Sequence, residues 1–186
     1  MEEDKYSVVR LYNVLDDGSF VPKNQPLNKE TCAQNLIDAI VDAFQLQEPN
    51  KGTTIHEADR EGVFDSDCDR LQIRALDLEN GWLDVANWKI EKYFSALYFF
   101  DDPGWRFYLP AYLVWALRCG EKSTSPTLEY LVGRLTRRQF DDYFDSLNTH
   151  QSFLVFKFLE HVAYFDIGGL RDEALEAIRS YWQAFM

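Results

Sequence analysis

The chain has 186 residues, of which 46% are hydrophobic and 16% are Phe, Trp or Tyr, and its formal net charge at pH 7 is −12. A chain of this length fits one domain, and its high aromatic content argues against disorder for the body of the chain. The acidic balance argues against a generic nucleic-acid binder, which would carry a basic footprint.

Three cysteines, Cys32, Cys68 and Cys119, lie far apart and form no CxxC motif. An odd number without pairing distances argues against a disulfide framework and for a reducing compartment. Met1 is followed by acidic residues instead of the basic start of a signal peptide, and no apolar run approaches the roughly 20 residues of a membrane span. We therefore expect a cytoplasmic protein that does not enter a membrane.

Residues 1–27 predict an extended N-terminal segment that contains a short β-hairpin. The stretch from Ser7 to Leu15 alternates loosely, Asp16-Asp17-Gly18 is a turn signal, and Phe20-Val21 resumes the strand pattern. Pro22 and Pro26 are expected to end this element, because proline cannot donate to a strand ladder.

Residues 28–186 predict a helical domain, so the fold class is mainly α: one compact bundle of about seven helices. Asn28 is the expected N-cap of a helix whose apolar stripe reaches Phe44 and which stops at Pro49–Gly52. The polar residues 50–68 predict a long loop. A short helix is expected over 69–78.

The aromatic middle of the chain predicts helices that are buried on several sides. One helix is expected from Asp84 to Tyr98, and a second is expected to begin with Asp102 as cap and Pro103 at its first position. Pro110 lacks a backbone donor, so we expect a kink or restart within two residues of it. The rings expected to form the core or line a pocket are Trp82, Trp88, Trp105, Tyr108, Tyr112 and Trp115.

Local signals also mark the helices of the C-terminal third. Ser125-Pro126 is expected to open one helix, Thr136–Gln139 has the spacing of a capping box, and Thr149 is a candidate cap for the next helix. Gly168-Gly169 is expected to stop that helix, and residues 170–182 predict a terminal helix.

Several blocks of this sequence resemble a known family. They are Trp82-Leu83-Asp84-Val85, the block Phe107-Tyr108-Leu109-Pro110-Ala111-Tyr112-Leu113, Thr149-His150-Gln151 with Phe158-Leu159, and Ala174-Leu175 with Tyr181-Trp182. Together they resemble an uncharacterised family of bacterial helical domains, a domain of unknown function, from about His56 to Trp182. The resemblance implies an all-helical bacterial domain, and it brings no activity, ligand or catalytic residue.

The sequence assigns no catalytic residue, metal site or cofactor. It contains no GxSxG, Gly-rich phosphate loop or SxxK motif. The histidines His56, His150 and His161 lack the close spacing of metal ligands. Asp65–Asp69 opens like a calcium loop, but Arg70 and Leu76 stand where such a loop needs glycine and glutamate.

Acidic residues are concentrated between Glu57 and Asp102. This quarter of the chain has twelve carboxylates and five basic side chains, so it carries −7 of the net charge of −12. Two interpretations are open, namely a solvated face or an acidic surface that steers a basic partner protein. The candidate contact residues are Asp59, Glu61, Asp65, Asp67 and Asp69.

Three classes of function fit these observations. The first is an acidic cytoplasmic protein that binds another macromolecule, in its most concrete form an immunity-like or antitoxin-like neutraliser of a partner protein. The alternative is a small-ligand-binding protein or enzyme with an aromatic-lined pocket. A third is a structural subunit of a larger assembly. The sequence names no partner and does not indicate an oligomeric state.

Overall fold

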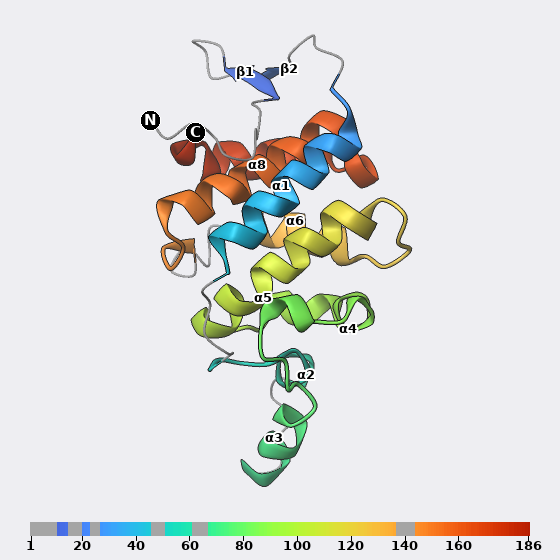
Figure 1. The fold of residues 1–186 in the computed structure, drawn as a ribbon, viewed down its shortest axis with the longest axis vertical. Helices are drawn as coiled ribbons and strands as arrows, with labels where there is room; N and C mark the ends of the chain where they lie inside the picture. Colours follow the sequence, from blue (N-terminus) through green and yellow to red (C-terminus); the bar gives the residue numbers. More distant parts are fainter. Residues whose placement is uncertain (1–10, 15–19, 23–26, 46–50, 61–66, 137–143) are drawn as a thin grey trace.

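The structure is a computed structural model that describes residues 11–14, 20–22, 27–45, 51–60, 67–136 and 144–186 (Figure 1). It is mainly helical, with eight α-helices in the described residues. They are α1 (Lys29–Ala43), α2 (Ile55–Asp59), α3 (Asp67–Arg74), α4 (Asn87–Lys92), α5 (Asp102–Trp115), α6 (Thr127–Thr136), α8 (Thr149–Phe165) and α9 (Arg171–Ser180). Five short helical turns lie between or after them: η1 (Trp82–Asp84), η2 (Phe94–Tyr98), η3 (Ala116–Gly120), η5 (Ile167–Gly169) and η6 (Trp182–Phe185).

The molecule is elongated, and its helices are stacked along the long axis. In Figure 1, α1 and α8 lie side by side in the upper half, α5 and α4 lie below them, and α2 and α3 form the lower end. The lower end therefore consists of short elements from one stretch of the sequence, whereas the upper half joins elements from both ends of the chain.

Two short strands lie at the upper end of the molecule. β1 (Tyr12–Val14) pairs with β2 (Phe20–Pro22) in antiparallel register, with Tyr12 opposite Pro22. The expected turn residues Asp16–Gly18 lie outside the described residues, as does Pro26, so the complete hairpin stays a prediction. The segment is attached to α8, because the buried Glu160 carboxylate accepts hydrogen bonds from the backbone N–H groups of Leu11 (2.7 Å) and Tyr12 (2.8 Å).

The first helix begins where the sequence predicts. The Asn28 side chain accepts a hydrogen bond from the Thr31 N–H at 2.7 Å, which confirms Asn28 as the N-cap of α1. The helix ends at Ala43, earlier than the predicted stop at Pro49. Its last carbonyls have side-chain donors, because Gln151 donates to Ala43 O and the Trp82 indole donates to Phe44 O.

The predicted long loop over 50–68 is wrong, because it contains helix α2. Thr54 and Glu57 form a capping box, in which the Glu57 carboxylate accepts the Thr54 N–H at 2.8 Å. The predicted helix over 69–78 begins two residues earlier and ends at Arg74 as α3. The predicted single helix from Asp84 to Tyr98 is also wrong, since η1, α4 and η2 divide that stretch.

Helix α5 is the centre of the fold. Every residue from Gly104 to Trp115 is buried except Arg106. Its N-cap is Asp101, which accepts the Gly104 N–H at 3.0 Å, so the predicted cap Asp102 is off by one residue. The same Asp101 oxygen accepts the Thr53 N–H at 2.7 Å and so joins the chain before α2 to α5.

The close contact at the start of α5 depends on glycine. A Cβ atom on Gly104 would lie 2.5 Å from the Thr53 carbonyl oxygen, and a Cβ atom on Gly52 would lie 2.3 Å from the Gly104 nitrogen. Two backbone segments meet here at a separation that a side chain would prevent.

The predicted restart of α5 at Pro110 is wrong, because the helix continues through this residue, whereas the predicted kink stays a prediction. Helix α5 continues to Trp115, and the backbone widens into the π-turn η3 only at Ala116. The residues on both sides of the proline, Leu109 and Ala111, are buried. Their packing outweighs the local preference of proline for a helix end, as tertiary contacts commonly outweigh propensity.

The C-terminal helices follow the predicted punctuation with small shifts. Asn148, not Thr149, caps α8 and forms a capping box with Gln151. Gly168 and Gly169 have φ values of 64° and 73° and separate α8 from α9, as predicted. Helix α6 begins at Thr127. The Thr136 hydroxyl donates to Val132 O inside α6, while the rest of its predicted capping box lies outside the described residues.

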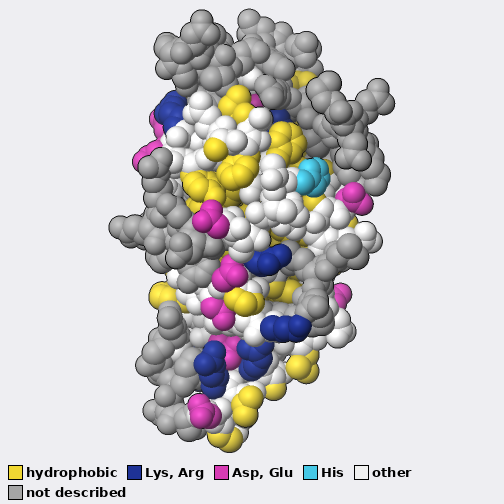
Figure 2. Space-filling view, turned by 90° about the vertical axis from the view of Figure 1, so that its left-hand side faces the viewer, with side chains coloured by type: hydrophobic (Ala, Val, Ile, Leu, Met, Phe, Trp, Pro, Cys, Tyr) yellow, Lys and Arg dark blue, Asp and Glu magenta, His cyan; other side chains and the backbone are white. Residues whose placement is uncertain are grey.

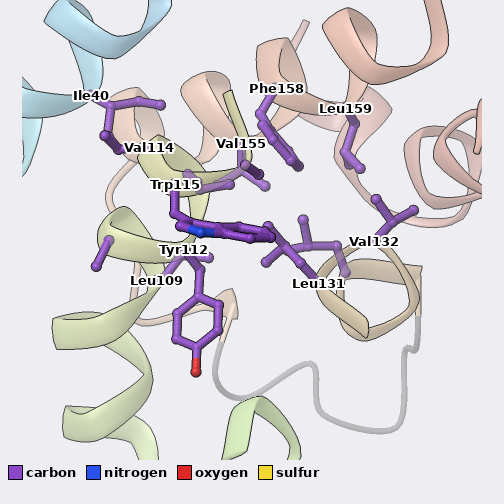
Figure 3. Close-up of a cluster of buried hydrophobic side chains, with 14 of the residues drawn as sticks. Ile40, Leu109, Tyr112, Val114, Trp115, Leu131, Val132, Val155, Phe158 and Leu159 are labelled. Atoms are coloured by element: carbon purple, nitrogen blue, oxygen red, sulfur yellow. The ribbon is translucent and has the colours of Figure 1, made fainter. Parts of the chain in front are cut away.

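The core is densest where α5 meets α6 and α8. Figure 3 shows the Trp115 indole between Val155 and Phe158 of α8 and Leu131 of α6. The indole N–H of Trp115 donates to the Glu91 carboxylate at 3.2 Å, so the ring is buried without losing its hydrogen bond.

Replacement of Trp115 by alanine should cost about 3–5 kcal/mol in the free energy of unfolding, because it deletes a buried aromatic ring. The matched control is Trp88→Ala, since the Trp88 side chain is 55% exposed. For this control we expect a loss below about 1 kcal/mol. Urea unfolding followed by circular dichroism measures both, and equal losses would contradict the different burial of the two rings.

Candidate functional site

The five predicted acidic contact residues do not form one described group. Asp59 is exposed at the end of α2, Asp67 is exposed at the start of α3, and Asp69 is partly buried in α3. Glu61 and Asp65 lie outside the described residues. The structure therefore leaves this set untested as a binding surface.

Many of the carboxylates between Glu57 and Asp102 have partners inside the protein. Of those that the structure describes, at least six accept hydrogen bonds from other residues: Glu57, Asp77, Glu79, Asp84, Glu91 and Asp101. The concentration of acid in this part of the sequence is thus in large part a set of structural acceptors.

Three of these acids lie in two groups of ion pairs, which Thr54 links through hydrogen bonds to Glu57 and Asp77. We call the two groups together the charge cluster: His56, Glu57, Arg70, Arg74, Asp77, Glu79 and Lys89. Glu57 is 2% exposed and lies 2.9 Å from Arg70 Nε and 2.8 Å from Arg74 Nη1. Because both arginines belong to α3, this carboxylate fixes α3 against α2. Arg74 also donates to Gly52 O at 2.8 Å.

The second half of the charge cluster is centred on Asp77. Its buried carboxylate lies 2.7 Å from Lys89 Nζ and 2.7 Å from His56 Nδ1, and it accepts the His56 backbone N–H at 2.9 Å. Lys89 Nζ also lies 2.6 Å from Glu79 and donates to Leu76 O at 2.9 Å. These contacts join the segment after α3 to both α2 and α4.

The surroundings shift the pKa values of the central pair in opposite directions. Burial raises the pKa of Asp77, but hydrogen bonds from Lys89 and His56 outweigh it and hold the pKa below its ordinary value. Burial lowers the pKa of Lys89, but its hydrogen bonds to Asp77 and Glu79 outweigh that effect and raise the pKa. Both groups are therefore charged at neutral pH.

The charge cluster has the properties of a structural element. Three carboxylates face three cations, Arg70, Arg74 and Lys89, so their charges balance. A general base or nucleophile needs a group that is free to exchange a proton, and both Glu57 and Asp77 are held by cations. One oxygen of Glu79, Oε2, is buried without a hydrogen-bond partner among the described residues.

Three leucines are exposed within residues 67–79, the segment that we call the α3 end. Leu71 is 68% exposed, Leu76 is 58% exposed and Leu78 is 78% exposed. Leu71 and Leu78 line a hollow of about 290 Å³ together with Arg74, Glu79, Phe107 and Tyr108. Figure 2 shows hydrophobic side chains gathered at the lower end of the molecule, beside basic and acidic side chains.

The six predicted rings separate into two groups. Trp82, Trp105, Tyr108, Tyr112 and Trp115 are at most 4% exposed, whereas Trp88 is 55% exposed. Trp88 therefore does not belong to the core, which was one of the two places predicted for these rings. That prediction assumed one regular helix from Asp84 to Tyr98, and the division into η1, α4 and η2 changes which side of the chain faces the core. Of the buried rings, Tyr108 borders the hollow at the α3 end.

No three His, Cys, Asp or Glu side chains in the described part of the chain come together in a way that could hold a metal ion. None of its helices is long and apolar enough to cross a membrane.

Sequence reasoning missed the residues of the charge cluster. Glu57 had a readable signal, because Thr54-Ile55-His56-Glu57 has the spacing of a capping box. Asp77 and Lys89 had none, since their pairing is set by how η1 and α4 turn back toward α2. No sequence pattern predicts this change in chain direction.

Residues 32–186 match a protein family described as a family of unknown function (DUF6714), and the chain belongs to this family. The predicted membership in an uncharacterised helical family is confirmed. The match begins at Cys32, earlier than the predicted start near His56, and leaves out the N-terminal strands. No curated protein and no solved structure matches the chain significantly.

The charge cluster predicts a specific response to acid. The folded-state pKa of Asp77 is lowered, so its stabilisation is complete above the unfolded pKa of about 3.9 and is lost as the pH falls through the lower folded value. Asp77→Asn should cost about 3–5 kcal/mol near pH 7, because it leaves a buried Lys89 charge with one carboxylate fewer. The difference from the unmodified protein should shrink below about pH 4.

Urea unfolding at pH 7, 5 and 3 measures this difference. Asp59→Asn is the matched control, since it removes one exposed carboxylate outside the charge cluster and should change stability little at any of these pH values. A difference between Asp77→Asn and the unmodified protein that stays constant down to pH 3 would contradict the assignment of the charged pair.

Proposed function

We propose that this protein binds a basic partner protein, and that the α3 end is the contact surface. The observation that supports this most is the exposure of Leu71, Leu76 and Leu78 on a segment that buried ion pairs hold in place. Single exposed leucines are common on protein surfaces, but three on one short segment form an apolar patch that a partner can cover.

The energy of such a contact comes from the leucines. Full burial of a leucine side chain contributes on the order of 2 kcal/mol. Part of that energy is normally lost to ordering of the binding surface. At the α3 end, Glu57 already holds both arginines of α3, and Asp77 already holds Lys89. The surface is therefore ordered before the partner arrives, and less of the binding energy is lost.

The chemistry of the partner follows from charge. The formal net charge of −12 attracts a basic protein at long range. Asp67 is exposed on α3, four positions before Leu71, and Asp59 is exposed at the end of α2. A partner with apolar side chains inside a basic surface fits both features. Neutralisation of such a partner, in the manner of an immunity protein or antitoxin, is the role that we assign to the contact.

The proposal includes a cytoplasmic and bacterial setting. Cys32, Cys68 and Cys119 are free thiols, which fits a reducing compartment. The bacterial origin rests on the sequence resemblance.

The test separates apolar contact from charge. The double variant Leu71→Gln/Leu78→Gln keeps side-chain size and charge but removes the apolar surface, and Leu83→Gln is its control, since Leu83 is 58% exposed and lies outside the α3 end. Immobilised unmodified protein and both variants are compared for the proteins that they retain from lysate, and a retained partner is then purified. We expect a basic protein that the unmodified chain and Leu83→Gln retain and that the double variant loses.

Binding kinetics with the purified partner complete the test. The double variant should weaken affinity about tenfold or more through faster dissociation, whereas Asp59→Asn/Asp67→Asn should slow association and reduce its salt dependence. Equal retention by all three proteins, or an acidic partner, would overturn the proposal. A dimer of the unmodified chain that becomes monomeric in the double variant would show that the α3 end is a self-contact instead.

A further inference from the structure

A buried carboxylate of α8 attaches the N-terminal strands to the helical domain. One oxygen of Glu160, Oε1, accepts the backbone N–H groups of Leu11 (2.7 Å) and Tyr12 (2.8 Å), and the other oxygen pairs with Lys157 of the same helix. Glu160 is 1% exposed and Lys157 is 2% exposed. We call Lys157, Glu160 and Tyr164 the α8 slot, and we call residues 11–14 and 20–22 the strap.

The α8 slot is formed within one helix. Its three residues stand three and four positions apart, which places them on one face of α8. Lys157 already balances the charge of Glu160, so an occupant of the slot has to supply hydrogen-bond donors and no charge. A buried carboxylate oxygen that lacks donors is unfavourable. The slot therefore requires an occupant, but its own geometry does not depend on which chain the occupant comes from.

The slot recognises the backbone of its occupant first. Both hydrogen bonds come from consecutive N–H groups, at the residue before β1 and at its first residue. Proline at either position would remove a donor. The side chains of Leu11 and Tyr12 are also buried, and the Tyr12 ring meets the Tyr164 ring edge to face at 5.7 Å. The slot thus fits a large apolar residue followed by an aromatic one, each with its N–H.

The strap lies outside the part of the chain that defines the family. The family match over residues 32–186 includes all three residues of the α8 slot, but neither Leu11 nor Tyr12. The two strands pair with each other and stand at the upper end of the molecule in Figure 1. The cluster labelled around Trp115 in Figure 3 contains no residue of the strap. The strap can therefore open as a unit while the densest part of the core keeps its contacts.

We propose that the α8 slot binds an extended segment of a partner protein, and that the strap is its autoinhibitory occupant. A segment linked to its own site has a high effective concentration, so a partner segment gains access only when the strap is displaced. Displacement uncovers Glu160 Oε1 and the Tyr164 ring. The partner segment carries the pattern of the strap, namely an apolar residue followed by an aromatic one, with no proline at either position.

The first experiment measures the opening of the strap in the unmodified protein. Hydrogen exchange followed by NMR compares the amides of Leu11 and Tyr12 with those of Phe158 and Leu159 inside α8. We expect the two strap amides to exchange at least about tenfold faster, through an opening that low urea concentrations accelerate little. If the strap amides exchange only together with those of α8, by global unfolding, the strap is not a separate unit and the proposal is overturned.

The second experiment supplies the segment from outside. A fluorescent peptide of residues 7–16 is added to the unmodified protein and to Leu11→Pro/Tyr12→Pro, which removes both donors from the strap and leaves the α8 slot unchanged. Fluorescence anisotropy should show at least about tenfold tighter binding to the proline variant, because its own strap no longer competes. A peptide with N-methyl groups at the positions of Leu11 and Tyr12 lacks the two donors and should not bind.

A slot variant is the control for the peptide. Lys157→Met/Glu160→Leu removes the acceptor and its cation together, so it leaves no buried charge unpaired. Added to the proline variant, it should abolish peptide binding, and circular dichroism checks that each protein is folded. Binding of the methylated peptide, binding that survives the loss of Glu160, or no binding to the folded proline variant would each overturn the proposal.

The exchange experiment needs no variant, so it decides whether the strap opens even where the proline variant does not fold. The α8 slot and the α3 end share no residues. Either proposal can therefore fail without the other.

Discussion

A helix without a solvent face determines how the rest of the chain is arranged. Helix α5 buries every residue from Gly104 to Trp115 except Arg106, so it requires neighbours on nearly all sides. Helices α1 and α4 and the turn η1 contact it directly, and Figure 3 shows α6 and α8 closing around Trp115 at its end. Two of the buried indoles in this arrangement obtain hydrogen-bond partners from neighbouring elements. Glu91 accepts the Trp115 indole N–H, and Trp82 donates to the end of α1.

The α3 end is held together differently, because it contributes little to this core. Ile73 is the one buried residue of α3, which is too little apolar burial to hold a short helix in place. Glu57 and Asp77 replace the missing apolar contacts with ion pairs to Arg74 and Lys89. A buried pair of this kind adds modest net stability, but it penalises any arrangement in which one partner is lost. The leucines at this end are exposed for the same reason, since no part of the described core reaches far enough to cover them.

Local signals in the sequence predicted local structure well. Asn28 caps α1 and Gly168-Gly169 separate α8 from α9 through backbone groups within four residues of themselves. Both predictions are confirmed. The caps at Asp101 and Asn148 were misplaced by one residue, because two neighbouring residues of each pair can cap. The restart predicted at Pro110 was wrong, because burial of the residues on both sides of it outweighs the local effect of proline. The charge cluster was not predictable, since Asp77 meets Lys89 through the turn η1, whose geometry no periodic pattern encodes.

The charge cluster also separates two roles that the sequence combines in one acidic stretch. Its three carboxylates and three cations balance, so the excess charge of −12 lies entirely in the rest of the chain. Long-range attraction of a basic protein would then come from that remaining charge, whereas the contact at the α3 end would be made by leucines on a locally neutral support. Attraction at a distance governs the rate of association and depends on salt, while apolar contact governs the rate of dissociation. A change of Asp67 and a change of Leu71 should therefore act on different rate constants, although the two residues are four positions apart in one helix.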